Sequence, residues 1–230
     1  MLTRGRSNPG SRRNRIFLID DHPIVRQGLA LLIDREADLE VCGSAEGAQS
    51  ALAGLPLTEP DLIILDISLH GPDGLDLLKT IRLKDEHLPV LVLSMHDEST
   101  YAERALRAGA NGYIMKQEAA EKVLVAIRRI LGGDVYLSER LTNKMLQQIV
   151  RGNDELRHSP VARLSDRELE IYRLIGSGHA TRQIADELHI SVKTVESYQA
   201  HIKVKLSLRT ARELVQHAIE WTVSEKSGAA

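Results

Sequence analysis

The sequence predicts an α/β domain, built on a doubly wound five-stranded parallel sheet, followed by a smaller all-helical domain. In the first half of the 230-residue chain, short apolar runs alternate with amphipathic stretches. In the last third, the strand-like runs stop and every apolar pattern has helical spacing. Because continuous apolar runs of four or five residues suit strands buried on both faces, the first half predicts a parallel sheet covered by helices.

Punctuating residues support this order of elements. Pro23 suits the first turn of a helix, and Gly109 and Gly132 stand where helix C-caps are expected. The expected strands are "RIFLID", "DLEVCGS", "DLIILD", "PVLVLS" and "GYIMK", and the helical stretches between or after them include "PIVRQGLALLIDRE", "GLDLLKTIRLK", "ESTYAERALRAG" and "AAEKVLVAIRRILGG".

Changes in composition predict the domain boundaries. A further helix is expected from Ser138, and the polar stretch around Pro160 has the composition of a linker. The predicted parts are a disordered basic tail (1–13), the α/β domain (14–135), a helix and linker (136–162), the helical domain (163–223) and a second disordered tail (224–230).

The composition excludes several classes of protein. Cys42 is the single cysteine, so an intrachain disulfide is impossible and a reducing, cytoplasmic location is expected. No apolar run approaches the roughly 20 residues of a membrane span, and the basic opening lacks the apolar core of a secretory signal, so no membrane partner is expected. Since the formal net charge is only −2, any binding of nucleic acid must come from a local surface.

Polar residues end four of the five predicted strands. Asp20 and Asp21 follow the first strand, Asp66 the third, Ser94 the fourth and Lys116 the fifth. In the strand order 2-1-3-4-5, the first and third strands flank the point where the order reverses, and the crevice outside their carboxyl ends is where ligands bind. The three carboxylates should therefore meet in one crevice.

Three clustered carboxylates repel one another unless a cation lies between them. Only oxygen ligands are available, so the expected cation is Mg²⁺. Lys116 and Ser94 would add a positive charge and a hydroxyl on the far side, which completes a cradle for a phosphoryl group on Asp66. The alternative is that these residues merely cap strands, but five polar residues at matching strand ends favour the phosphorylation site.

The segments "LIDDHPIVRQGL", "DLIILDISL", "VLVLSMHDE" and "AGANGYIMK" resemble the flavodoxin-like receiver domain of bacterial two-component response regulators. The resemblance implies that a sensor histidine kinase phosphorylates Asp66. It also implies that Lys116 pairs with the phosphoryl group and that Ser94 and Tyr113 relay the change, with Tyr113 turning inward. The implied ligands of Mg²⁺ are Asp20, Asp21, Asp66 and the backbone carbonyl of Ser68.

Two turns of the receiver depart from the usual family pattern. Leu69 and His70 replace a common Met-Pro pair, with Pro72 two residues further on. Gln117 follows Lys116 where many receivers have a proline after a cis bond, and a cis bond before another residue costs about 3 kcal/mol. The path of both turns therefore stays open, and His70 and His96 could either tune the access of water or be exposed loop residues.

The last third carries two adjoining helices with recognisable starts. Ser165 and Glu168 form an S-x-x-E capping box, Thr181 can cap the helix "RQIADELH", and Ser191 can cap "VKTVESYQAHIKVKL". Two helices joined by a tight turn form a helix-turn-helix, whose second helix enters the major groove of DNA. Capping and periodicity alone would equally allow an ordinary small helical bundle.

The segments "LSDRELEIYRLI", "IADELHISVKTVESY" and "KLSL" are similar to the four-helix LuxR-type DNA-binding domain. A receiver followed by this domain is typical of NarL/FixJ-class response regulators. The resemblance implies a transcriptional regulator rather than an enzyme, which binds double-stranded DNA in a sequence-specific way, forms a homodimer on activation and contacts RNA polymerase.

The second helix of this motif supplies the candidate DNA contacts. Glu196 could accept a hydrogen bond from a cytosine amino group or be solvated, and Tyr198 could pack against the domain or contact phosphate. The residues expected to reach phosphates or base edges are Lys193, Thr194, Ser197 and Lys205.

The last helix, "ARELVQHAIEW", carries an apolar stripe at Leu214, Ala218 and Trp221. This stripe could form the dimer surface or belong to the core of the helical domain.

Two other functions compete with this interpretation. A Mg²⁺-dependent phosphohydrolase with an aspartyl nucleophile would want a second carboxylate two residues after Asp66, where Ser68 stands. A regulator that works without phosphorylation could carry a degenerate receiver, but the complete acidic set and Lys116 argue against it.

Overall fold

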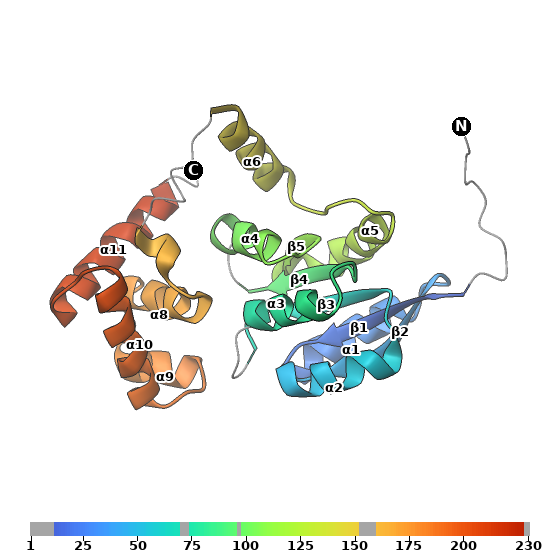
Figure 1. Cartoon of the computed structure of the whole chain (residues 1–230), viewed down its shortest axis with the longest axis horizontal. Coiled ribbons are helices and arrows are strands. Elements are labelled where there is room, and N and C mark those ends of the chain that lie inside the picture. Colours follow the sequence, from blue (N-terminus) through green and yellow to red (C-terminus); the bar gives the residue numbers. More distant parts are fainter. Residues whose placement is uncertain (1–11, 70–73, 96–97, 152–159, 228–230) are drawn as a thin grey trace. The chain divides into compact units, whose positions relative to one another are not determined.

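A computed structural model describes residues 12–69, 74–95, 98–151 and 160–227. The chain forms two compact units that divide between Thr142 and Asn143, inside the predicted 136–162 connecting segment (Figure 1). None of the helices in the described ranges combines the length and the apolar character needed to cross a bilayer.

The first unit is the predicted five-stranded parallel sheet, in the order β2-β1-β3-β4-β5. Helices cover both of its faces (Figure 1). The strands are β1 (Asn14–Ile19), β2 (Leu39–Ala45), β3 (Leu62–Asp66), β4 (Val90–Ser94) and β5 (Gly112–Met115), and the helices are α1 (Pro23–Ile33), α2 (Ala48–Thr58), α3 (Gly74–Lys84), α4 (Glu98–Arg107) and α5 (Ala119–Leu131).

Alternate side chains of each strand supply the two layers of the core. Ile16 and Leu18 of β1 share one hydrophobic cluster with Ile33 of α1 and Ile127 of α5. Phe17, between them in sequence, points the other way, and its ring lies so near α2 that a Cβ on Gly54 would meet it at 3.2 Å. Both faces of the strands are therefore buried, which explains their continuous apolar runs.

Glycines allow close approaches at the functional edge of the sheet and at helix ends. A Cβ on Gly74 would lie 2.4 Å from Ile67 Cα and 2.6 Å from Asp66 O, so glycine lets α3 begin against the end of β3. Gly109 ends α4 with φ +102°, as predicted. Gly132 is the C-cap of α5, as predicted; it keeps helical angles, and the left-handed residue is the next one, Gly133 (φ +91°).

The turn after β5, which the sequence left open, and the predicted start of the helix after α5 are both described by the structure. No cis peptide bond occurs in the described ranges, so the Lys116–Gln117 bond is trans, and a short 3₁₀ turn (Lys116–Glu118) leads into α5. The helix α6 (Glu139–Arg151) begins after Ser138, whose hydroxyl accepts a hydrogen bond from Leu141 N at 3.1 Å. This is the start that the sequence predicts.

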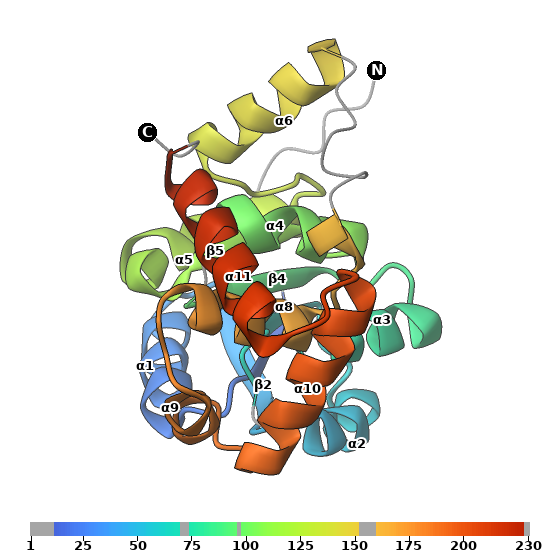
Figure 2. The same ribbon diagram turned by 90° about the vertical axis from the view of Figure 1, so that its left-hand side faces the viewer.

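The second unit begins within α6 and is helical where it is described, with a short 3₁₀ turn (Pro160–Arg163) before α8 (Figure 2). The predicted capping box is present, since Ser165 N donates to Glu168 Oε2 at 2.6 Å and Ser165 Oγ accepts from Glu168 N. After α6, the α-helices described in this unit are α8 (Asp166–Gly176), α9 (Thr181–Glu187), α10 (Val192–Lys205) and α11 (Ala211–Ser227).

The predicted cap of α9 is wrong by one residue. Ala180 is the N-cap and Thr181 is the first helical residue. Gln183 replaces the missing cap, because its Oε1 accepts from Ala180 N at 2.8 Å. The hydroxyl of Thr181 accepts instead from Gln199 Nε2 of α10 at 3.3 Å, so it joins the two helices of the motif.

The apolar stripe predicted on α11 belongs to the core. Leu214 and Ala218 are buried, and the Trp221 ring lies 5.4 Å from the Tyr172 ring of α8, centroid to centroid. Gly176, at the end of α8, allows this contact, because a Cβ there would lie 2.2 Å from Thr222 Oγ1 and 2.4 Å from Ala218 O. The core interpretation of the stripe is therefore the one that the structure supports.

We predict that Gly176→Ala lowers the free energy of unfolding of the second unit by about 1–3 kcal/mol through overpacking. Trp221, the single tryptophan, reports that transition by fluorescence in a urea titration. The control is Gly28→Ala in α1, where a Cβ meets nothing within 4 Å and should stabilise the helix. A higher midpoint for Gly176→Ala would contradict the proposed close contact.

Candidate functional site

A buried ion-paired group lies at the carboxyl ends of β1 and β3. The two strands are direct neighbours, with Ile19 opposite Leu65, so Asp20 and Asp66 leave the sheet side by side. Lys116 Nζ lies 2.7 Å from Asp66 Oδ2 and 2.7 Å from Asp20 Oδ2. The side chains of Asp66, Asp20 and Lys116 are 0%, 3% and 7% exposed, so this ammonium bridges two carboxylates that water barely reaches.

Backbone amides complete the hydrogen bonding of these carboxylates. Ser68 N donates to Asp66 Oδ1 and His22 N donates to Asp20 Oδ1, each at 2.8 Å. Burial raises the pKa of Asp66, Lys116 lowers it in part, and the charge of Asp20 raises it again. The positive charge of Lys116 thus opposes, without cancelling, the cost of ionising a buried carboxyl.

Asp21 and His22 extend the acidic cluster. His22 Nδ1 lies 2.6 Å from Asp21 Oδ1 and 3.4 Å from Asp20 Oδ1. One ligand atom from each of Asp20, Asp21, His22 and Asp66 falls within 4.8 Å of the others. Such a concentration of carboxylate oxygens fits a hard divalent cation.

Two residues near this cluster were missed by the sequence reasoning. His22 directly follows the two aspartates, and the guanidinium of Arg26, one helical turn later in α1, donates to the main-chain oxygen of Asp20. Their positions just after the strand end were the available signal. Of the predicted set, Ser68 is at the site through its N–H, while its carbonyl as a metal ligand stays a prediction.

Ser94 and Tyr113 lie on the strands beyond Asp66. Asp66 pairs with Leu93 of β4, so Ser94 ends the next strand, and Ser94 pairs in turn with Met115 of β5. Both side chains are buried, Tyr113 to 1% exposure. Tyr113 therefore already has the inward position that was expected only after phosphorylation.

Some predictions lie outside the described residues. They concern His70, Pro72 and His96 near the phosphorylation site, residues 1–11 and 228–230 of the predicted tails, and residues 152–159 of the predicted linker.

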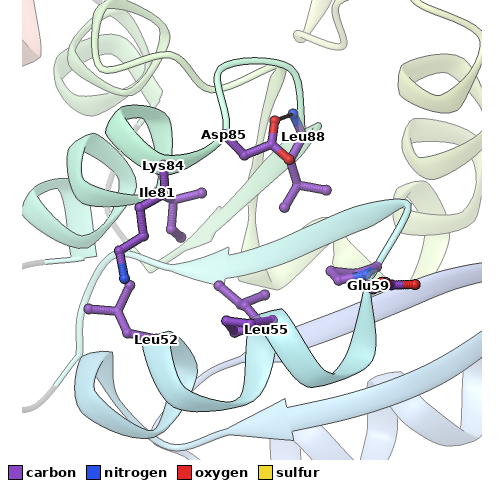
Figure 3. Close-up of a pocket in the computed structure, with 9 residues that line it drawn as sticks. Leu52, Leu55, Glu59, Ile81, Lys84, Asp85 and Leu88 are labelled. Carbon is purple, nitrogen blue, oxygen red and sulfur yellow. Dashed lines mark hydrogen bonds between the residues drawn. The ribbon is translucent and has the colours of Figure 1, made fainter.

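An apolar hollow of about 320 Å³ lies in the first unit between α2 and α3 (Figure 3). Leu52 and Leu55 line it from α2, and Ile81 and Lys84 from α3. None of the predicted site residues lines it, so it does not serve Asp66 as the substrate pocket that a phosphohydrolase would need.

The predicted DNA contacts lie along α10. Lys193, Glu196 and Ser197 are exposed in its first two turns, and Tyr198 is half-buried. Thr194 is partly occupied by the helix cap, because its Oγ1 lies 2.7 Å from Ser191 Oγ.

The exposed face of α10 continues beyond the predicted residues. His201, four residues after Ser197, and Val204 are also exposed, and the sequence reasoning missed both. A step of four residues from Ser197 to His201 and of three more to Val204 follows one face of the helix and would have found them.

Lys205 has a partner inside the domain. Its Nζ lies 2.6 Å from Glu168 Oε2, and the two side chains are 39% and 5% exposed. Glu168 therefore serves both the capping box of α8 and the last turn of α10. The structure adds a role in stability to the predicted role in phosphate contact.

Comparisons with known proteins identify both domains. Residues 16–128 match the response regulator receiver domain, and residues 162–218 match the LuxR family of bacterial regulatory proteins. The chain is 35% identical over 210 residues to the oxygen regulatory protein NreC of Staphylococcus haemolyticus, a match that covers 90% of this chain and 97% of NreC.

Two solved structures are also similar. A LuxR-family two-component response regulator from Aurantimonas is 34% identical, with a TM-score of 0.56, over 60% of this chain and 99% of that one. RcsB from Salmonella enterica serovar Typhimurium, bound to promoter rprA in the presence of the phosphomimetic BeF3−, is 25% identical with a TM-score of 0.56. That match covers 90% of this chain and 98% of RcsB.

A phosphoryl-receiver fold followed by a helix-turn-helix unit defines a DNA-binding transcriptional response regulator, not an enzyme. The chain belongs to the two-component response regulators that join a receiver domain to a LuxR-type DNA-binding domain.

We predict that Lys205→Ala destabilises the second unit by about 1–2 kcal/mol at neutral pH, the range for a partly exposed hydrogen bond to a charged group. Burial alone would raise the pKa of Glu168, but the hydrogen bonds from Lys205 and Ser165 outweigh burial and hold it below 4.5. A lowered carboxyl pKa gives stability that is complete above about pH 4.5 and is lost as the pH falls through the folded-state value.

The stability difference between wild type and Lys205→Ala should therefore shrink in acid. Urea titrations followed by Trp221 fluorescence from pH 3 to 7 measure this dependence. Lys203→Ala, in the same turn of α10, is the control, with an expected change below about 0.5 kcal/mol. A difference of the same size at every pH would show that the Glu168 contact is not its source.

Proposed function

We propose that this regulator is switched by phosphorylation of Asp66, supplied by a sensor histidine kinase. The observation that carries the proposal is the buried Lys116 ammonium shared by Asp66 and Asp20 at adjacent strand ends. If Asp66 is phosphorylated, the Lys116 ammonium lies beside it and can pair with the phosphoryl oxygens. The hydroxyl of Ser94, at the end of the neighbouring strand, can donate a hydrogen bond to them.

The chain's own residues account for the transfer. An oxygen of Asp66 attacks the phosphorus of a phosphohistidine, the P–N bond breaks, and its electron pair returns to the imidazole. Lys116 leaves Asp66 to pair with the new phosphoryl oxygens, while Ser68 N–H keeps the carboxyl oriented. Asp20, Asp21 and Asp66 would hold Mg²⁺, which when bound neutralises negative charge between the carboxylates and the incoming phosphoryl group.

We expect Asp66→Asn to abolish labelling by radioactive acetyl phosphate, because the amide oxygen is not a nucleophile of comparable strength. The fold should survive, since Asn keeps the shape and the hydrogen bond from Ser68. Asp76→Asn, an exposed carboxylate of α3, is the matched control and should label like wild type. Full incorporation by Asp66→Asn would disprove the assignment.

The exposed face of α10 is the proposed DNA-reading surface. Ser191 caps the N-terminus of α10. The positive end of the helix dipole and the charge of Lys193 together favour contact with a DNA phosphate there. Ser197 and Glu196 stand one turn further along, where side chains of a recognition helix reach base edges.

Phosphate contacts position a protein on DNA and base contacts specify the sequence. Lys193→Ala should therefore weaken binding to all sequences alike and lower the slope of log affinity against log salt by about 1. Ser197→Ala and Glu196→Ala should instead change the ranking of sequences in a selection from random duplexes. If the ranking is unchanged in both variants, neither Ser197 nor Glu196 contacts the bases that determine specificity.

A second copy of the chain is the proposed partner of α11. Val215, Ile219 and Val223 are exposed at spacings of four residues, on a face distinct from the buried Leu214 and Ala218. Arg212 and Glu220 border a hollow on this face. A two-fold axis close to Gln216 would place each Arg212 opposite the partner's Glu220, which makes the face self-complementary.

We expect Ile219→Glu to raise the dimer dissociation constant at least tenfold in sedimentation with beryllofluoride and Mg²⁺. The substitution places an unpaired charge in the apolar part of the proposed interface, and burying it there opposes association. Leu57→Glu, the same kind of change at an exposed leucine of the first unit, is the control. If both variants associate equally well, the dimer surface does not lie on α11.

Contact with RNA polymerase and a cytoplasmic location complete the proposal, because a transcriptional regulator acts where promoter DNA and polymerase meet.

A further inference from the structure

The chain segment before α6 is attached to the outer edge of β5. Tyr136 N donates to Asn111 O at 2.9 Å, and Tyr113 N donates to Tyr136 O at 3.0 Å. Gly112 allows this approach, because a Cβ there would lie 2.9 Å from Tyr136 O and 2.8 Å from Ile130 Cδ1. The backbone of Tyr113, one of the predicted switch residues, is thus bonded directly to the segment that leads into α6.

A second attachment follows two residues later. Ser138 Oγ donates to Glu98 Oε1 of α4 at 2.6 Å and accepts from Leu141 N at 3.1 Å. One hydroxyl therefore caps the first turn of α6 and binds the first turn of α4, using both its donor and its acceptor. The cap needs only Ser138, whereas the contact with α4 needs Glu98 as well.

Both attachments end on elements of the phosphorylation site. Glu98 stands four residues after Ser94 in the chain, and Tyr113 precedes Lys116 by three. The sequence of α6 spans the division between the two units, at Thr142 and Asn143. A change at Ser94 or β5 can therefore reach the start of the helix through which the chain enters the second unit.

We propose that Glu98 and Ser138 are positioning residues that couple the state of the phosphorylation site to α6. The proposal rests on the phosphorylation of Asp66 set out above. The contact is present with Tyr113 buried, the inward position that the resemblance to receiver domains associates with phosphorylation. Phosphorylation then stabilises one arrangement of β5, α4 and α6 together. Without the Ser138–Glu98 hydrogen bond, phosphorylation no longer changes the position of α6.

The test compares DNA affinity with and without beryllofluoride plus Mg²⁺, by fluorescence anisotropy on a duplex selected with the wild-type protein. The wild-type ratio should lie between about five- and 150-fold, the usual range of coupling. In Glu98→Ala the ratio should fall to within about twofold of one, because the loaded protein binds DNA less tightly. Beryllofluoride binding itself should be unchanged.

Three further variants separate this coupling from helix capping. Ser138→Asp keeps a good N-cap but sets two carboxylates against each other, so it should lose the ratio as Glu98→Ala does. Glu98→Gln keeps an acceptor oxygen and Ser138→Thr keeps the hydroxyl, so both should keep the wild-type ratio. Amide exchange at Leu141 and Thr142 should slow with beryllofluoride in wild type and not in Glu98→Ala.

The outcomes are distinct. A wild-type ratio above fivefold that persists in Glu98→Ala and Ser138→Asp overturns the coupling role and leaves the proposed function standing. A wild-type protein that binds beryllofluoride without any change in DNA affinity overturns both.

Discussion

The Lys116 ammonium between Asp20 and Asp66 is the interaction on which the receiver depends. Two carboxylates at adjacent strand ends would repel each other in a site this dry, and one cation bonded to both makes their burial tolerable. Because the lysine follows β5 while the aspartates follow β1 and β3, this bond ties together the functional ends of three strands. Gly74 serves the same end by letting α3 begin against the main chain of Asp66.

Lys116 only partly compensates the negative charge of the carboxylates at this site, so the site can respond to a further charged group. Burial raises the pKa of Asp66 even with Lys116 beside it, and Asp21 adds a further carboxylate, which lies beside His22 Nδ1. A cation and a phosphoryl group can therefore each alter the local balance. Two elements near the site, β5 and α4, also hold the start of α6.

The second unit uses one buried carboxylate in a related way. Glu168 closes the capping box of α8 and binds Lys205 at the end of α10, so the same side chain starts one helix and fixes the position of another. Together with the Thr181–Gln199 hydrogen bond near the middle of α10, this contact at its last turn fixes α10 against α9 and α8. The exposed face from Lys193 to Val204 is thereby presented by a rigid helix.

The sequence by itself determined the strand order, the meeting of Asp20, Asp66 and Lys116, the capping box and the helix-turn-helix. The strands, the polar residues at their ends and the capping box follow from local patterns, whereas the strand order follows from the known order of doubly wound sheets and the helix-turn-helix from the resemblance of its motif. Tertiary structure alone decided the rest. Burial of Leu214, Ala218 and Trp221 depends on which face of α11 meets α8, and periodicity cannot choose between a core and a partner. The partners of Lys205, His22 and Ser138 likewise depend on residues distant in the chain or on side-chain directions, because a charged or hydroxyl group bonds whatever the fold brings within about 3 Å.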